Sequence, residues 1–206
     1  ERGSVYMSVE VAIKLKIEDP EQLIEKLEGL GFIKGEQLLE SDTYFTSENH
    51  DFVKLGEALR VRQIRNVDTD EISAVITYKG KKLDDRSMAR EELELEIPDA
   101  EVGKTLLQRI GFYSVPVLEK KRWYFRRNEM TACVDQVTGL GDYLELEIIV
   151  ETEAEREGAL QKIENMLLSL GYSMKDTTRH SYLSMLTNQT RAMDVDISSG
   201  KSGSGE

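Results

Sequence analysis

The stretch Val9-Glu10-Val11-Ala12-Ile13-Lys14-Leu15-Lys16-Ile17 alternates apolar side chains with charged or small ones. Successive side chains of a β-strand point to opposite faces, so this alternation predicts a strand with one apolar face. Glu10, Ala12, Lys14 and Lys16 share the other face. The apolar face has to be buried, and we expect helices to cover it. The charged face then needs its own explanation.

Seven further segments alternate in the same way and also predict strands. They are residues 41–46, 57–65, 73–79, 89–97, 117–126, 130–136 and 142–150. Charged side chains share one face of several of these strands: Arg60 with Arg62, Lys120 with Arg122, Glu145 with Glu147, and Arg90 with Glu92, Glu94 and Glu96. On the strand at 89–97, Leu93, Leu95 and Ile97 take the opposite face, which is expected to be buried. Lys79 and Asp135 add one charge each on two other strands. The sequence therefore predicts about eight strands whose polar faces carry charges of both signs.

This charged face has two interpretations. In the first, an antiparallel sheet packs one face and leaves the other in water, which requires only polar residues of any kind. In the second, the strands close into a barrel and these side chains point inward. The near absence of Ser, Thr, Asn and Gln from the face favours the second. Such a lining is costly to bury without a ligand or water, so we expect a wet tunnel that binds a polyanion and metal ions.

Three amphipathic helices are predicted near residues 20–30, 99–110 and 153–170. Each ends with apolar residues three apart, a glycine and an aromatic residue, as in Leu27-Glu28-Gly29-Leu30-Gly31-Phe32. Together the patterns predict an α+β fold, a closed, eight-stranded, mainly antiparallel β-barrel with helices packed outside. We expect one domain over residues 8–187. Residues 1–7 and 191–206 are expected to be tail segments, the second of them rich in Gly and Ser.

The composition argues against several functions. The 206 residues carry 27 Lys and Arg against 39 Asp and Glu, a formal net charge of -12. A surface with this excess of negative charge is expected to repel nucleic acid and anionic membranes. The single cysteine, Cys133, excludes an internal disulfide and a Cys-rich zinc site, and its surroundings are typical of a buried strand. No stretch is long and apolar enough for a membrane span, and we expect a cytoplasmic protein.

The residues also resemble the CYTH, or triphosphate tunnel metalloenzyme, superfamily, and within it the class IV adenylyl cyclase branch. The resemblance runs from residue 8 to about residue 187 and rests on eight short motifs in order. They are Glu10-Val11-Ala12-Ile13-Lys14; Asp42-Thr43-Tyr44-Phe45; Ala58-Leu59-Arg60-Val61-Arg62; Thr77-Tyr78-Lys79-Gly80; Arg90-Glu91-Glu92-Leu93-Glu94; Lys120-Lys121-Arg122; Asp135 followed by Gly139-Leu140-Gly141-Asp142-Tyr143-Leu144-Glu145-Leu146-Glu147; and Ser181-Tyr182-Leu183. One position departs from the family pattern, because Ala12 stands where the family has its second N-terminal Glu.

The resemblance implies a role for each charged position. Phosphate oxygens would be contacted by Arg60, Arg62, Lys79, Arg90, Lys120 and Arg122, whose donors match those oxygens. Mg²⁺ or Mn²⁺, hard cations that prefer carboxylate and phosphate oxygen, would be held by Glu10, Glu145 and Glu147. Lys14, Glu92 and Asp135 complete the catalytic group. Lys14 would hold phosphate or orient a Glu, and the two carboxylates are further candidate metal ligands. Lys16, Glu94, Glu96 and Arg126 are interpreted as ordinary surface charges.

Three functions remain open from these residues. A class IV adenylyl cyclase would convert ATP to cyclic AMP and pyrophosphate, by attack of the 3′-hydroxyl on the α-phosphate. An inorganic or thiamine triphosphatase would let water attack the terminal phosphate. With Ala12 in place of a ligand, the protein could also bind a triphosphate or nucleotide without turning it over. The ligand is a triphosphate in each case, and a homodimer is compatible with the sequence. His50 and His180 have no Ser or Cys partner at an interpretable spacing, so neither points to nucleophilic catalysis.

Overall fold

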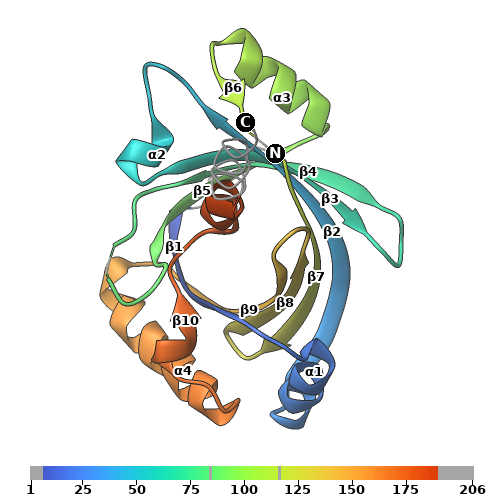
Figure 1. The fold of residues 1–206 in the computed structure, drawn as a ribbon, viewed down its shortest axis with the longest axis vertical. Helices are drawn as coiled ribbons and strands as arrows, with labels where there is room; N and C mark the ends of the chain where they lie inside the picture. Colours follow the sequence, from blue (N-terminus) through green and yellow to red (C-terminus); the bar gives the residue numbers. More distant parts are fainter. Residues whose placement is uncertain (1–6, 84, 116, 190–206) are drawn as a thin grey trace, which may run out of the picture.

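The strands of this protein form one antiparallel sheet that closes on itself (Figure 1). The computed structural model describes residues 7–83, 85–115 and 117–189, so the predicted tails lie outside the described residues except for Met7. In ring order the strands are β1 (Met7–Lys16), β5 (Arg90–Ile97), β4 (Ile72–Lys79), β3 (Ala58–Asn66), β2 (Ile33–Thr46), β7 (Leu118–Arg127), β8 (Met130–Val137) and β9 (Gly141–Val150). Pairing of β9 with β1 closes the ring. The predicted eight-stranded barrel is confirmed.

The remaining elements lie around this ring. Two short strands extend it, since β6 (Tyr113–Ser114) pairs with β2 and β10 (Thr177–Thr178) pairs with β1. The helices are α1 (Pro20–Gly29), α2 (Phe52–Leu55), α3 (Ala100–Arg109) and α4 (Arg156–Ser169), with 3-10 helices η1 (Glu153–Glu155) and η2 (Met174–Asp176) and a helical segment at residues 182–189. The three predicted helices are confirmed, the third beginning with η1, whereas α2 and the helix at 182–189 were not predicted. Across the described ranges, no helix is both long and apolar enough to cross a membrane.

Local sequence signals set the ends of the helices. Asp19 and Asp99 cap α1 and α3, each accepting a hydrogen bond at 2.9 Å from the backbone N–H three residues further on. After the same helices, Gly31 and Gly111 have φ angles of 86° and 100°, in the left-handed region that glycine adopts without strain. The chain therefore turns back toward the barrel wall at defined residues.

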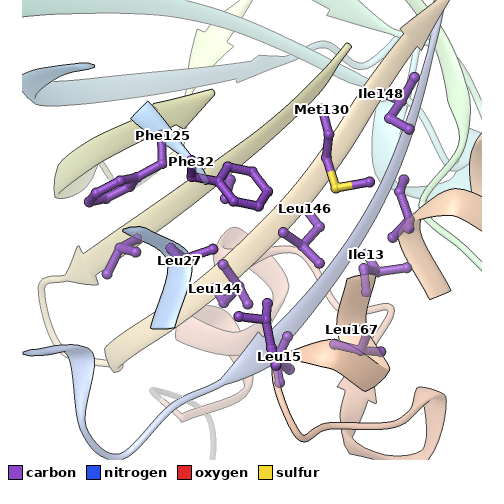
Figure 2. Packing of buried hydrophobic residues seen from close by; sticks show 14 of the residues in the cluster. Ile13, Leu15, Leu27, Phe32, Phe125, Met130, Leu144, Leu146, Ile148 and Leu167 are labelled. Atoms are coloured by element: carbon purple, nitrogen blue, oxygen red, sulfur yellow. The ribbon is translucent and has the colours of Figure 1, made fainter. Parts of the chain in front are cut away.

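The main apolar core lies outside the ring, where α1 and α4 cover β1, β7, β8 and β9. Figure 2 shows Ile13 and Leu15 of β1 in one cluster with Leu144 and Leu146 of β9 and Leu167 of α4. Burial of each such side chain stabilises the fold by about 1.5–3 kcal/mol. A smaller cluster lies beneath α3 on β3 and β4. Because the apolar faces of the strands point outward to these helices, the alternate, charged faces point into the barrel.

Two details of the wall differ from the prediction. β2 begins at Ile33, whereas the sequence predicted a strand only from residue 41. The register of β2 against β7 shifts between Lys34 and Gln37, and such a bulge breaks the alternation on which the prediction depended. Leu95 was expected to be buried but is 55% exposed, because α3 packs on β3 and β4. The longer β2 also brings Glu40 into the barrel.

Candidate active site inside the barrel

The strand register sets the inward-facing charges beside one another. Lys14 pairs with Glu145, Arg122 with Asp135, Lys79 with Glu92, and Lys120 with Glu40. Cross-strand partners point to the same face, so their side chains can meet. Buried charged residues of this face are Lys14, Glu40, Asp42, Arg60, Arg62, Arg90, Glu92, Lys120, Arg122 and Asp135. The charges fall into three groups.

The first group joins β2, β3 and β7. Arg62 donates to the Asp42 carboxylate from Nε at 2.6 Å and from Nη2 at 2.7 Å, and its Nη1 lies 2.7 Å from Glu40. Lys120 pairs with Glu40 as well. Burial alone would raise the pKa of both carboxyl groups, but Arg62 and Lys120 lower the pKa of each well below its usual range. The two carboxylates therefore hold Arg62 and Lys120 in fixed positions, a role that the sequence analysis did not assign to them.

The second group joins β1, β7, β8 and β9. Arg122 forms a two-pronged ion pair with Asp135 at 2.6 Å for both bonds and also pairs with Glu145. Lys14 Nζ lies 3.2 Å from Glu145. Tyr182, from the helical segment 182–189, donates to Asp135 at 2.8 Å, and Lys14 Nζ lies 3.7 Å from the centre of its ring. Tyr182 thus ties the C-terminal segment to the barrel lining.

The third group joins β1, β4, β5 and β9 and is richer in carboxyl groups. Lys79 lies 3.4 Å from Glu10 and pairs with Glu92. Burial, with the nearby Glu10, raises the pKa of Glu92 to about 7 and that of Glu147 to about 8. Glu147 makes no hydrogen bond or ion pair with any residue that the structure describes. This wall therefore gathers three carboxyl groups around one lysine, and two of them bind protons near neutral pH.

Two buried arginines retain unused donors. Arg60 reaches Asp42 only through Nη1, at 3.4 Å, and its buried Nε has no partner within the described residues. Arg90 is 8% exposed, and its guanidinium forms no ion pair or hydrogen bond within the same ranges. A buried guanidinium without acceptors is costly, so these donors are suited to the oxygens of an anionic ligand.

The carboxyl groups suit a metal ion that needs only one or two ligands from the protein. In the described ranges no three His, Cys, Asp or Glu side chains converge closely enough to hold a metal between them. Mg²⁺ commonly binds through one or two carboxylates, with phosphate oxygens and water completing its shell. Glu147, without a partner and close to Glu10, fits that arrangement. Ala12 faces Glu147 across the β1 and β9 pair and supplies no third ligand.

Other candidate residues lie apart from the site. His50 pairs with Glu57 at 2.7 Å, and His180 is exposed. Lys16, Glu94, Glu96 and Arg126 are exposed, in agreement with their interpretation as surface charges.

Cys133 is buried in β8 as predicted, but it pairs with Tyr124 and Glu145 and so shares the inner face. Burial raises the pKa of its thiol well above the usual value, which keeps it unreactive.

The fold and the lining define a closed antiparallel β-barrel with a buried, charged interior. The chain belongs to the CYTH family, since the profile of the CYTH domain matches residues 8–182. The resemblance seen in the motifs is thereby confirmed.

Similar proteins support this assignment. The chain is 34% identical over 177 residues to "Putative adenylate cyclase MJ0240" of Methanocaldococcus jannaschii, covering 86% of this chain and 98% of that protein. It is 27% identical over 143 residues to "Adenylate cyclase CyaB" of Aeromonas hydrophila, covering 69% and 70%. Among solved structures, the PH1819 protein of Pyrococcus horikoshii OT3 is 32% identical, with a TM-score of 0.80 over 87% of this chain and 99% of that one.

Proposed function

We propose that this protein is a metal-dependent enzyme of the class IV adenylyl cyclase type, which converts ATP to cyclic AMP and pyrophosphate. The observation that carries the proposal is the buried Nε of Arg60, which has no acceptor within the described residues, together with the guanidinium of Arg90, which forms no ion pair there. A triphosphate supplies many charged oxygens to such donors. The names of the two curated relatives support ATP as the substrate.

In this proposal the cations of the lining hold and orient the phosphate chain. Arg60 offers free donors to phosphate oxygens. Arg62 and Arg122, whose forks face Asp42 and Asp135, add positive charge that neutralises charge developing during phosphoryl transfer. Their carboxylate partners fix them in place before the substrate arrives, which reduces the reorganisation needed in the reaction. A divalent cation, when bound beside Glu10 and Glu147, would supply further neutralisation of the phosphate charge. Glu92 and Asp135 remain candidate ligands, and Lys79 and Lys120 candidate phosphate contacts.

A product assay tests the proposal. The protein is incubated with ATP, inorganic tripolyphosphate and thiamine triphosphate, each with Mg²⁺ and with Mn²⁺, and the products are separated by anion-exchange chromatography. Equal amounts of cyclic AMP and pyrophosphate from ATP would support the cyclase. Orthophosphate from any of the three would instead assign a triphosphatase. Absence of product under every condition would refute the proposal that this protein is an enzyme.

A second candidate function is triphosphate binding without turnover, and Ala12 favours it. The side chain of Ala12 is 1% exposed and faces Glu147, at the position where the family has a metal-binding Glu. Under this candidate, calorimetry detects tight tripolyphosphate binding, while neither the native protein nor Ala12→Glu forms product. Ala12→Gln is the matched control, with the same added bulk and no charge. Turnover restored by Glu but not by Gln would exclude the binding-only function.

We also propose a cytoplasmic location, which the single buried, free thiol of Cys133 supports because it needs no oxidising compartment. Cell fractionation tests this, and a membrane or extracellular fraction would contradict it. A homodimer is also compatible with the sequence. Size-exclusion chromatography with light scattering measures whether two copies associate.

A further inference from the structure

The loop between β4 and β5 closes over the edge of β1 beside Ala12. On β1, Glu10 pairs with Arg90, and the carbonyl of Ala12 accepts a hydrogen bond at 2.9 Å from the N–H of Met88. Two residues further along, Lys14 pairs with Thr178 of β10. In Figure 1 this loop runs beside α4 and β10. Residues from two distant segments therefore meet at the part of β1 that carries Ala12.

The side chains gathered here are predominantly cationic. Lys82, in the same loop, is half-buried and donates from Nζ to the backbone carbonyl of Arg179, which follows β10. Arg179 in turn donates to the carbonyl of Ser87 at 3.2 Å. Both acceptors are neutral carbonyls, so these bonds position the cations without neutralising them.

Neither Lys82 nor Arg90 forms an ion pair with a carboxylate within the described residues. Arg90 is 8% exposed and has no ion pair within the described residues. Lys14 shares Glu145 with Arg122, and Arg179 lies 3.5 Å from Asp85, whose side chain is fully exposed. Burial, together with repulsion from Arg90, Arg179 and Lys14, lowers the pKa of Lys82 to about 8. The residue that faces the barrel between Glu10 and Lys14 is Ala12, which contributes no charge.

We propose that Lys82 is a further phosphate-binding residue, which together with Arg90 of the main site forms an anion subsite beside Ala12. A lysine ammonium and an arginine fork are the usual donors to phosphate oxygens. The subsite adjoins Lys14 of the main site, so one phosphate chain can contact both. This inference rests on the proposed function and narrows the substrate class, because Lys82 would then bind one end of the triphosphate or the phosphate product released from it.

Calorimetric titration with tripolyphosphate and with pyrophosphate tests the subsite. Lys82→Met is expected to bind tripolyphosphate roughly tenfold more weakly or worse, because it loses a charge-assisted hydrogen bond. Lys81→Met is the matched control, since Lys81 is the exposed neighbour in the same loop and should bind as the native protein does. Lys82→Arg keeps the charge and should retain most of the affinity.

The two ligands distinguish the sources of the phosphate. A loss confined to tripolyphosphate assigns the subsite to one end of the substrate, and a loss for both ligands assigns it to the product as well. If Lys82→Met binds both ligands as tightly as the native protein does, Lys82 is not part of a phosphate subsite. The proposed function would not be affected by that result. No binding of either ligand or of ATP to the native protein would instead refute the proposed function, and the subsite with it.

A pH series gives a second readout. Bound phosphate favours protonated Lys82, so native affinity is full below pH 8 and falls as the pH rises above it, whereas Lys82→Arg stays charged. Taking the ratio of the two affinities cancels the ionisation of the ligand and of Lys14, which is common to both proteins. The other charged groups that face Lys82 are Arg90 and Arg179, and both proteins contain them. A ratio that does not change between about pH 7 and 9.5 would contradict a role for the Lys82 charge.

Discussion

Replacement of Asp42 by Asn is expected to destabilise the protein by about 3 kcal/mol. The carboxylate is 1% exposed, and Arg62 donates to it at 2.6 and 2.7 Å while Arg60 donates at 3.4 Å. Asn keeps the shape but removes the charge and one acceptor, which leaves buried guanidinium charge uncompensated. Loss of one partner of a buried ion pair typically costs about 3–5 kcal/mol, and the lower end applies because Arg62 retains Glu40.

Urea unfolding followed by circular dichroism measures this effect. The matched control is Asp70→Asn, which breaks the ion pair with Arg65 of the same sheet, where the side chains are 72% and 50% exposed. An exposed pair contributes about 0–1 kcal/mol. The Asp42 variant should also lose roughly 6–12 °C in Tm for a chain of this size. If the free energies of unfolding of the two variants agree within about 1 kcal/mol, Asp42 does not balance buried charge and the reasoning is wrong.

Three further predictions follow from the same lining. Arg60→Met should weaken tripolyphosphate binding roughly tenfold in calorimetry, since an unpaired buried donor is lost, whereas Arg65→Met on the same strand should not. Tyr182→Phe removes the hydrogen bond to Asp135 and should lower the free energy of unfolding in urea by about 1.5–3 kcal/mol; no change would place the residue outside the network. Stability should fall on acidification, because the lowered pKa values of the two β2 carboxyl groups stabilise the fold above their unfolded pKa near 4 and this contribution is lost as the pH falls. Urea unfolding at several acidic pH values measures it, and Asp42→Asn should show a shallower loss.

Strand alternation was enough to predict the barrel and most of its lining. In β1, β3, β5, β7 and β9 the charged residues share one face over several repeats, so one register places all of them inside. The eight motifs, in their order along the chain, then identified the family, which the match to the CYTH domain confirms. The predicted positions of Lys14, Arg62 and Arg122 are buried on the inner face, as the structure confirms.

The pairing between those charges was not predictable from alternation. Glu40 meets Arg62 because β2 begins before residue 41, where the predicted strand began. The bulge between Lys34 and Gln37 interrupts the alternation at the start of that strand. Tyr182 reaches Asp135 from 47 positions along the chain, a contact that depends on how the C-terminal segment docks. Lys82 lies in a loop, where no periodic pattern indicates which way a side chain points.

The imbalance of charge across Ala12 leads to a last prediction about metal and phosphate. On one side, Glu10, Glu92 and Glu147 exceed the cations that meet them, and the pKa of Glu147 is raised to about 8 by burial and by Glu10. On the other, neither Lys82 nor Arg90 forms an ion pair with a carboxylate within the part of the chain that the structure describes.

A divalent cation alone would balance the carboxyl groups, and a phosphate chain alone would balance Lys82 and Arg90. When both are bound, the cation and the phosphate chain also attract each other. We therefore expect Mn²⁺ to raise the affinity for a non-hydrolysable ATP analogue, and the analogue to raise the affinity for Mn²⁺ by the same factor. Calorimetry of each ligand, with and without the other, measures both. Glu147→Gln should reduce this factor, whereas Glu96→Gln, which alters an exposed carboxylate of β5, should not. Equal affinities with and without the second ligand would show that metal and phosphate bind independently, and the charge imbalance would then have no part in binding.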